Sequence, residues 1–355
     1  MSTTQETKAP ASFTATQRKD ALPPPPLSIL AKKLEVDELS IEWLAGDGSD
    51  RCYYRISSPH LQRDYVLMQL SENDAIKLKE NGYEWIAIGE LLARHGVIVP
   101  RTVAKIPEYA AIVIEDYGNQ MLETVIMRDI ERSPQIDCYY DLALKNISHF
   151  LKIPAEPGTV WTTRAFDEER FVWEMNFFQK YFIEQVCNLS FDKDQNETFQ
   201  CECRALSKFL AGYSKYFVHR DYHTRNLMFQ DERVAVIDFQ DARLGPPSYD
   251  LVSLCFDSYI PLDQKTRLRY LESFIVKLSD KKLAQEIEIS WPAMLLQRQY
   301  KALGSFGYLS IVKKRGNYLQ YIKPALATLE NTAVFDKRWP FISGELVKLI
   351  ASNIG

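Results

Sequence analysis

The chain is built around the stretch Phe217-Val218-His219-Arg220-Asp221-Tyr222-His223-Thr224-Arg225-Asn226, which Val234-Ala235-Val236-Ile237-Asp238-Phe239-Gln240-Asp241 follows closely. Apolar runs in this region predict three short strands, at residues 217–218, 227–229 and 234–237. We expect the polar loop after the first strand and the end of the last strand to lie side by side. The side chains of Asp221, Asn226 and Asp238 would then meet.

These three side chains are of the types that a phosphoryl-transfer site requires. Such a site needs one carboxylate to accept the proton of the attacking hydroxyl, and oxygen ligands for Mg²⁺ ions that bridge the phosphates. We assign Asp221 to the proton and Asn226 and Asp238 to the metal. The order His-Arg-Asp, then Asn, then a strand-terminal Asp-Phe matches the catalytic and metal loops of kinases. The alternative is a structural turn with an internal Arg220–Asp221 ion pair, and the ordered match of all three positions argues against it.

Together with Gly245-Pro246-Pro247-Ser248-Tyr249-Asp250-Leu251, these motifs resemble the aminoglycoside phosphotransferase and choline kinase family. More narrowly, Arg-Asp-Tyr-His-x-Arg-Asn with Ile-Asp-Phe-Gln-Asp is similar to the bacterial kinases that phosphorylate the anomeric hydroxyl of N-acetylmuramate and N-acetylglucosamine in cell-wall recycling. Residues 49–55 and 297–304 support the resemblance, which spans about residues 27–335.

The resemblance implies an α+β, bilobal protein-kinase-like fold with a small antiparallel-sheet N-lobe and a larger, mostly helical C-lobe. It implies ATP and Mg²⁺ as cofactors and a small amino sugar as substrate. It also implies that Asp250 accepts hydrogen bonds from the backbone of the catalytic loop. We expect a disordered arm over residues 1–26, the N-lobe over 27–116 and the C-lobe over 117–355, because the proline-ending arm cannot bury a core.

Composition excludes several other classes of protein. The 355 residues exceed one typical core, which favours two lobes. A net charge of -4 gives no sign of a nucleic-acid partner. Six scattered cysteines without a signal peptide indicate reduced thiols and a cytoplasmic location. No apolar run is long enough for a membrane span, and nothing indicates an obligate protein partner.

Periodicity gives the elements of the N-lobe. We expect one helix over 27–38, strands over 40–44, 51–56 and 65–70, a single helix over 74–95, and a hairpin over 101–106 and 109–115. The loop holding Gly46, Gly48 and Ser49 could lay its N–H groups over nucleotide phosphates, although such a hairpin is also an ordinary turn. Glu115 and Tyr117 mark the expected hinge, where backbone groups would hold adenine.

One kinase feature is missing from the third strand. A Lys is expected there for the α and β phosphates, yet the strand offers Met68 and Gln69. Arg51 and Arg55 are the candidate replacements, because a guanidinium fork matches phosphate oxygens. The alternative is that both are exposed strand residues. Glu84 falls where the family's helix Glu would lie, but the strand Lys that would be its usual ion-pair partner is absent.

The C-lobe is expected to be helical outside the catalytic region. Ser133 and Pro134 predict the start of a helix to residue 152, and Asp167 opens another. We expect a polar loop over 188–196, a helix over 197–215, and helices from 249 to the C-terminus.

Several C-lobe side chains are candidates for binding the acceptor. Gln297, Arg298 and Lys301 share one helix face by their spacing and could donate to a sugar carboxylate or N-acetyl group. A solvated face is the alternative. The other candidates for acceptor binding are Glu174, Asn176, His223 and Arg225.

The sequence therefore predicts a kinase that transfers the γ-phosphoryl group of ATP to the anomeric hydroxyl of an N-acetylated amino sugar. An aminoglycoside, an amino alcohol or another metabolite is the alternative acceptor. A nucleotide-binding pseudokinase is the alternative from another class, suggested by the absent strand Lys. The intact Asp221, Asn226 and Asp238 weigh against it.

Overall fold

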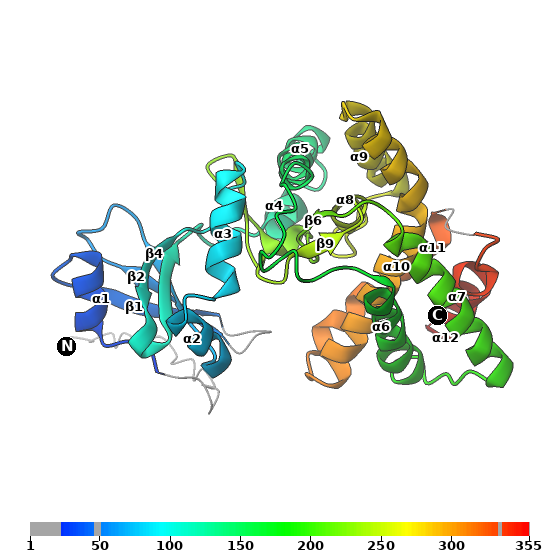
Figure 1. Cartoon of the computed structure of the whole chain (residues 1–355), viewed down its shortest axis with the longest axis horizontal. Coiled ribbons are helices and arrows are strands. Elements are labelled where there is room, and N and C mark those ends of the chain that lie inside the picture. Colours follow the sequence, from blue (N-terminus) through cyan, green and yellow to red (C-terminus); the bar gives the residue numbers. More distant parts are fainter. Residues whose placement is uncertain (1–22, 46–50, 333–335, 355) are drawn as a thin grey trace, which may run out of the picture. The chain divides into compact units, whose positions relative to one another are not determined.

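The computed structural model describes residues 23–45, 51–332 and 336–354. The chain divides into two compact units (Figure 1). The first unit comprises the residues up to Tyr83 together with Thr102–Asp116, and the second comprises Glu84–Arg101 together with the residues from Tyr117 onward.

The first unit is a five-stranded antiparallel sheet with two helices (Figure 1). Its elements are α1 (Leu27–Leu34), β1 (Ser40–Ala45), β2 (Cys52–Ser57), β3 (Tyr65–Gln69), α2 (Glu72–Lys79), β4 (Thr102–Ile106), η1 (Pro107–Tyr109) and β5 (Ala111–Glu115). The strand order is β1-β2-β3-β5-β4. Leu30 of α1 packs with Ile56, Leu67 and Val113, so this helix covers the apolar face of the sheet.

The single helix expected over 74–95 is wrong, because the structure has two helices there. The first, α2, begins after Ser71, whose hydroxyl accepts the N–H of Asp74 at 3.2 Å. It ends before Asn81, whose φ of 57° is left-handed and cannot continue a helix. The second, α3 (Glu84–Arg94), belongs to the second unit.

The second unit is mostly helical and carries the remaining strands. Besides α3 it contains α4 (Leu122–Arg128), α5 (Ser133–Phe150), α6 (Glu168–Phe178), η2 (Gln179–Glu184), α7 (Lys193–Ala211), β6 (Tyr216–Val218), η3 (Thr224–Asn226), β7 (Leu227–Gln230), β8 (Arg233–Val236), β9 (Arg243–Gly245), α8 (Tyr249–Cys255), α9 (Gln264–Lys277), α10 (Lys281–Ile311), η4 (Gly316–Tyr321), α11 (Ile322–Asn331), η5 (Phe341–Glu345) and α12 (Leu346–Ile354). The three strands predicted around the polar loop are confirmed as β6, β7 and β8. Strand β7 pairs with β8, and β6 pairs with the later strand β9.

Local caps explain where the helices of this unit begin. Asp167 caps α6 as predicted, accepting the N–H of Arg170 at 2.7 Å. The expected start of the next helix at residue 197 is wrong, because Asp192 and Gln195 form a capping box that starts α7 at Lys193. Ser133 is the first residue of α5 and not its cap.

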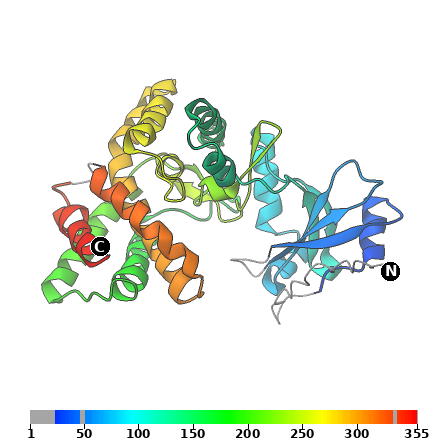
Figure 2. The same ribbon diagram turned by 180° about the vertical axis from the view of Figure 1, so that it is seen from behind.

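The longest helix, α10, packs closely on the segment α6–η2. A Cβ added to Gly304 would lie 2.8 Å from the Cα of Phe178, and one added to Gly307 would lie 2.8 Å from the carbonyl carbon of Tyr181. Both glycines therefore let the two backbones approach. Helices α6, α7, α10, α11 and α12 form one group (Figures 1 and 2). None of the helices in the described ranges combines the length and apolar character that crossing a membrane requires.

Candidate active site

The polar loop after β6 is held by a buried carboxylate at the start of α8. Asp250 accepts the backbone N–H groups of His219 and Arg220 at 2.6 and 3.1 Å. These two bonds confirm the scaffold role predicted for Asp250. Burial raises the pKa of this carboxyl to about 7, against the lowering effect of the two N–H groups.

A second buried carboxylate, which the sequence analysis missed, fixes the far end of the loop. Asp257 accepts the N–H of Thr224 at 3.0 Å and its hydroxyl at 2.6 Å. It also accepts the N–H of Tyr259 at 2.9 Å. Asp257 lies just beyond α8 and carries no motif, so only the tertiary structure identifies it.

The loop and the end of β8 lie side by side, as predicted. His219 is fully enclosed, its ring Nε2 lies 2.9 Å from the carbonyl oxygen of Ile237, and burial lowers its pKa to about 4. The N–H of Ile237 in turn donates to the carbonyl of Asn226 at 3.0 Å. Asn226 and Asp238 are therefore brought to neighbouring backbone segments.

Two residues of this region have a left-handed backbone that side chains other than glycine rarely adopt. Arg220 has a φ of 85° and Asp238 a φ of 62°. Each such conformation costs of the order of 1–3 kcal/mol and persists only where the surroundings impose it. One strained residue, Arg220, is the chain neighbour of Asp221, and the other is Asp238 itself. Both carboxylates are ones to which the sequence assigns chemistry.

The donor set of Asn226 and Asp238 fits Mg²⁺. The side-chain amide of Asn226 donates to the carbonyl of Asp221 at 2.9 Å, which leaves its oxygen as the ligand atom. Carboxylate and amide oxygens are the donors that Mg²⁺ prefers, and it is usually held by few protein ligands plus water and phosphate oxygens. Within the described ranges no three His, Cys, Asp or Glu side chains form a metal cluster.

Asp221 lies between cations. Its Oδ1 accepts from the Nζ of Lys301 at 2.5 Å, and its Oδ2 is 3.6 Å from the Nε of Arg220. Burial by itself raises the pKa of Asp221, but the charges of Lys301, Arg220 and Arg298 outweigh it and hold the pKa well below its usual value. The carboxylate is therefore ionised at neutral pH, as a proton acceptor must be.

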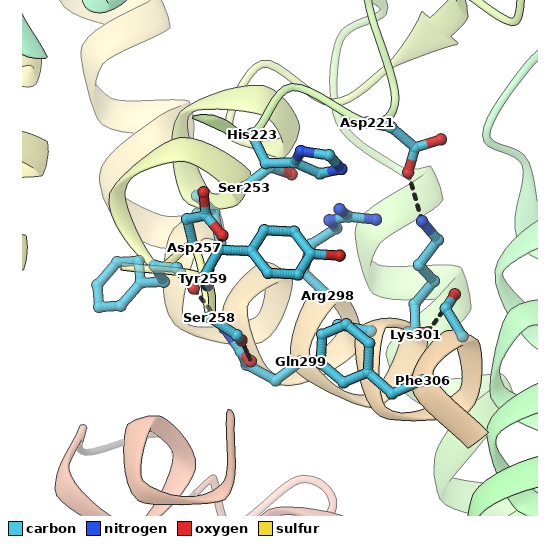
Figure 3. Close-up of a pocket in the computed structure, with 14 residues that line it drawn as sticks. Asp221, His223, Ser253, Asp257, Ser258, Tyr259, Arg298, Gln299, Lys301 and Phe306 are labelled. Atoms are coloured by element: carbon cyan, nitrogen blue, oxygen red, sulfur yellow. Dashed lines mark hydrogen bonds and ion pairs between the residues drawn. The ribbon is translucent and has the colours of Figure 1, made fainter. Parts of the chain in front are cut away.

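Asp221 opens into a cavity within the second unit (Figure 3). The cavity encloses about 480 Å³, its open mouth included. Besides Asp221 it is lined by His223, Tyr259, Arg298 and Lys301, with apolar walls that include Phe256 and Phe306. Neither Asn226 nor Asp238 lines it. The cavity is thus separate from the two candidate metal ligands.

The three residues predicted on one face of α10 are indeed together, and the solvated face considered as the alternative is excluded. Gln297 is fully buried and donates to Glu174 at 2.7 Å. Arg298 is 7% exposed and donates to the hydroxyl of Tyr249 at 2.8 Å. Lys301 binds Asp221. Of the three, Arg298 and Lys301 line the cavity.

The other predicted acceptor residues are placed differently. His223 lines the cavity, and its Nδ1 has no partner in the described part of the chain. Arg225 does not line it, because its guanidinium binds both carboxylate oxygens of Glu123, at 2.9 and 2.7 Å, and stacks on Tyr259. Asn176 is exposed, does not line the cavity, and accepts from Gln200 at 2.9 Å.

Glu174 is also outside the cavity lining, since it is buried and its contacts are with Gln297 and Arg170. The residues that sequence reasoning missed are Tyr259 and Phe306, which reach the cavity from the segment after α8 and from α10. No local motif marks either of them.

The predicted phosphate cations are both paired with carboxylates of the first unit. Arg51 binds Asp74 at 2.9 Å, and Arg55 binds Asp116 at 2.5 Å. Neither side chain is an exposed strand residue, because each is at most 15% exposed. Gly46, Gly48 and Ser49 lie outside the described residues. Of the two residues predicted to mark a hinge, Glu115 ends β5, 3.6 Å from Arg63, and Tyr117 begins the last segment of the second unit.

Of the two strand residues found where Lys was expected, Met68 and Gln69, the polar one is a buried amide. Gln69 is 1% exposed, and its Nε2 donates to the carbonyls of Tyr109 and Ala110 at 2.7 and 3.1 Å. In the second unit, Glu84 at the start of α3 pairs with Arg164 at 2.9 Å. An arginine of its own unit thus takes the place of the absent Lys as the partner of Glu84.

The chain is similar in sequence to phosphotransferases and sugar kinases. The model of the phosphotransferase enzyme family matches residues 40–281. An N-acetylmuramate/N-acetylglucosamine kinase from Pseudomonas putida is 28% identical over 230 residues, which are 65% of this chain and 63% of that protein. One of the same name from Caulobacter vibrioides is 24% identical over 299 residues, covering 76% of this chain and 79% of that protein. The matches to the first two such relatives span about 60% of their length.

The fold is that of the solved aminoglycoside phosphotransferases. An ADP-bound enzyme of this kind superposes with a TM-score of 0.57 at 16% identity, covering 85% of this chain and 96% of that one. At this identity the likeness shows the protein-kinase-like fold, and it confirms the bilobal α+β architecture expected from the sequence.

Proposed function

Because the chain belongs to the phosphotransferase enzyme family, we propose that it is an ATP-dependent kinase of the anomeric hydroxyl of an N-acetylated amino sugar. N-Acetylmuramate and N-acetylglucosamine are the proposed acceptors, as in the names of its relatives. An activity of this kind would serve the recovery of cell-wall sugars in the cytoplasm.

The observation that carries this proposal is the position of Asp221. Its carboxylate is kept ionised by the surrounding cations and faces a cavity lined by both polar and apolar side chains. The loop that carries it is anchored at both ends, by Asp250 and Asp257. A fixed carboxylate beside a small-molecule cavity suits proton removal from an acceptor hydroxyl.

The residues of the chain divide the work of the reaction. An acceptor hydroxyl in the cavity would donate its proton to Asp221, which orients the oxygen for attack. Asn226 and Asp238 would hold Mg²⁺, whose charge neutralises the phosphates of bound ATP. Lys301 and Arg220 would keep the carboxylate in place and ionised before the acceptor binds.

The test is acceptor-dependent release of ADP with a panel of amino sugars, aminoglycosides and amino alcohols. We expect turnover with N-acetylmuramate or N-acetylglucosamine and phosphate on the anomeric oxygen, which phosphorus-proton coupling in the NMR spectrum of the product locates. Phosphate at the 6-hydroxyl, or turnover of an amino alcohol alone, would contradict the amino-sugar assignment. No turnover with bound ATP would favour a pseudokinase.

A further inference from the structure

Two cations of α10 point into the cavity one helical turn apart. Figure 3 shows the guanidinium of Arg298 and the ammonium of Lys301 among the side chains that line the cavity, with the ammonium bonded to Asp221 and the guanidinium near His223 and Tyr259. Lys301 has Asp221 as its partner at 2.5 Å. Arg298 has only neutral partners, the hydroxyl of Tyr249 at 2.8 Å and the ring of the same residue at 4.6 Å.

The charge of Arg298 is uncompensated by direct contact. The side chain is 7% exposed, its Nε has no partner, and no carboxylate in the described ranges forms an ion pair with it. Burying a guanidinium without an anion is costly, because the lost hydration is not replaced. A cation kept in this state beside a cavity indicates that a ligand supplies the anion.

The neighbouring carboxylates are engaged by other groups. Both oxygens of Asp250 accept backbone N–H groups of the catalytic loop. Asp257 accepts from Thr224 and Tyr259. Glu174 accepts from Gln297 and lies 3.7 Å from Arg170. Asp221 has Lys301 and Arg220 as its direct partners, so its charge acts on Arg298 only from a distance.

The anion could belong to the acceptor or be the transferred phosphoryl group. The candidate metal ligands Asn226 and Asp238, which would mark the nucleotide side, do not line the cavity. Arg298 lines it together with apolar side chains such as Phe256 and Phe306, which suit the carbon atoms of an organic acid. These positions favour the acceptor as the source of the anion.

We propose that Arg298, assisted by Lys301, is the subsite for a carboxylate carried by the acceptor, so that this site prefers an acidic sugar to its neutral counterpart. The inference rests on the proposed function and deepens it. A guanidinium that binds a carboxylate also fixes its direction, and it would thereby decide which hydroxyl faces Asp221.

Calorimetry without nucleotide tests the subsite independently of turnover. N-Acetylmuramate carries a lactyl carboxylate that N-acetylglucosamine lacks. We expect the wild-type chain to bind the acidic sugar about 10- to 100-fold more tightly, as for a hydrogen bond to a charged group. Arg298→Gln should abolish this preference, and Arg298→Lys should keep part of it. Arg269→Gln, which removes an exposed arginine of α9, is the matched control and should keep all of it.

Each outcome of these measurements either supports the carboxylate subsite or overturns it. Equal affinity of the wild-type chain for the two sugars, or no binding of either, overturns the subsite. A preference that survives Arg298→Gln overturns it as well.

Steady-state rates identify the source of the anion. An equal fall in the kcat of Arg298→Gln with both sugars would assign Arg298 to the phosphoryl group and overturn the proposal. If binding shows the preference but phosphate appears elsewhere than on the anomeric oxygen, the subsite stands and the proposed function fails. Melting temperatures report whether each variant folds, and Arg298→Lys keeps the test valid if Arg298→Gln does not.

Discussion

At the scale of single residues, the carboxylate of Asp221 has two tasks that substitution can separate. It is the proposed proton acceptor, and it is the counter-ion of the buried Lys301. An amide keeps the shape of the side chain but can neither accept the proton nor balance the ammonium. The chemical and structural effects of a substitution must therefore be measured apart.

We predict that Asp221→Asn lowers kcat by about 10²- to 10⁴-fold, the usual contribution of general-base assistance. Calorimetry of Mg-ATP binding should show little change, because the nucleotide ligands are untouched. The melting temperature records any cost of leaving Lys301 beside an amide. A variant that keeps more than about a tenth of the wild-type kcat would rule out the role of Asp221.

Asn226 and Asp238 should behave differently from Asp221, since they are proposed metal ligands. We predict that Asn226→Ala and Asp238→Ala weaken Mg-ATP binding as well as turnover, because Mg²⁺ is held by few protein oxygens. Titration of Mg²⁺ at fixed ATP should show a raised metal requirement in both variants. Unchanged affinity and metal dependence in both would refute the assignment.

The position of the polar loop beside the end of β8 was predictable from the sequence, and its surroundings were not. The roles proposed for Asp221, Asn226 and Asp238 rest on spacing within one short stretch, which local geometry determines. Asp257 and Tyr259 reach the site through the tertiary packing that follows α8, which no local pattern encodes. Arg225 carries a motif position yet binds Glu123 at a sequence separation of 102 residues, a pairing that spacing does not reveal.

At the scale of elements, the position of α10 depends on its close contact with η2. We predict that Gly307→Ala destabilises the chain by about 1–3 kcal/mol, as overpacking does, despite the usual gain of replacing glycine within a helix. The new Cβ would meet the backbone of Tyr181, which cannot move aside as a side chain would. Because Lys301 and Arg298 lie on the same helix, kcat/KM should fall as well.

Gly212→Ala is the matched control for this prediction. Gly212 follows α7 with a φ of -75°, and a Cβ there would lie 3.4 Å from the carbonyl oxygen of Phe209, close to ordinary contact. Its urea unfolding midpoint should be unchanged or slightly raised. If Gly307→Ala matched this control, the close approach would not govern the packing of α10.

The junction of α4 and α5 gives a pH-dependent prediction. Hydrogen bonds from Arg128 and from the hydroxyl of Tyr139 hold the pKa of Asp129 below its usual value. The ionised form therefore stabilises the fold above the usual Asp range, and this contribution is lost as the pH falls through the lowered pKa. We predict that Asp129→Asn lowers the melting temperature at pH 7 and that the difference from wild type shrinks toward pH 3.

The exposed Asp231→Asn serves as the control for the change in net charge. Thermal scans of the three proteins across this pH range provide the comparison. A difference between wild type and Asp129→Asn that stays constant with pH would show that the charge of Asp129 does not contribute.

Element boundaries were predicted best where a cap or a break is encoded locally. Asp167 was recognisable as a helix cap, whereas the break at Asn81–Gly82 was hidden by apolar positions that continue on either side. The partners of Arg51 and Arg55 depend on which carboxylates the sheet and α2 bring near, and strand periodicity does not contain that information.

At the scale of the whole molecule, the point where the folded chain begins can be measured. Residues 1–22 of the arm expected over 1–26 lie outside the described part of the chain. Of the four described residues of the arm, Pro25 is buried, and the carbonyl of Pro26 accepts the N–H groups of Ile29 and Leu30. We predict that deleting residues 1–22 leaves the melting temperature nearly unchanged, whereas deleting 1–26 lowers it through the loss of these contacts of α1. Equal melting temperatures of the two deletions would show that the proline segment contributes nothing.

The buried amide of Gln69 also determines how this chain would respond to chemical labelling. Electrophilic ATP analogues that acylate the strand lysine of kinases require a basic amine at that place. The nitrogen of Gln69 has no basic lone pair and already donates to two carbonyl oxygens. Such reagents would find no reactive amine at Gln69, so we expect them to leave strand β3 unlabelled where they would mark an enzyme that keeps the lysine.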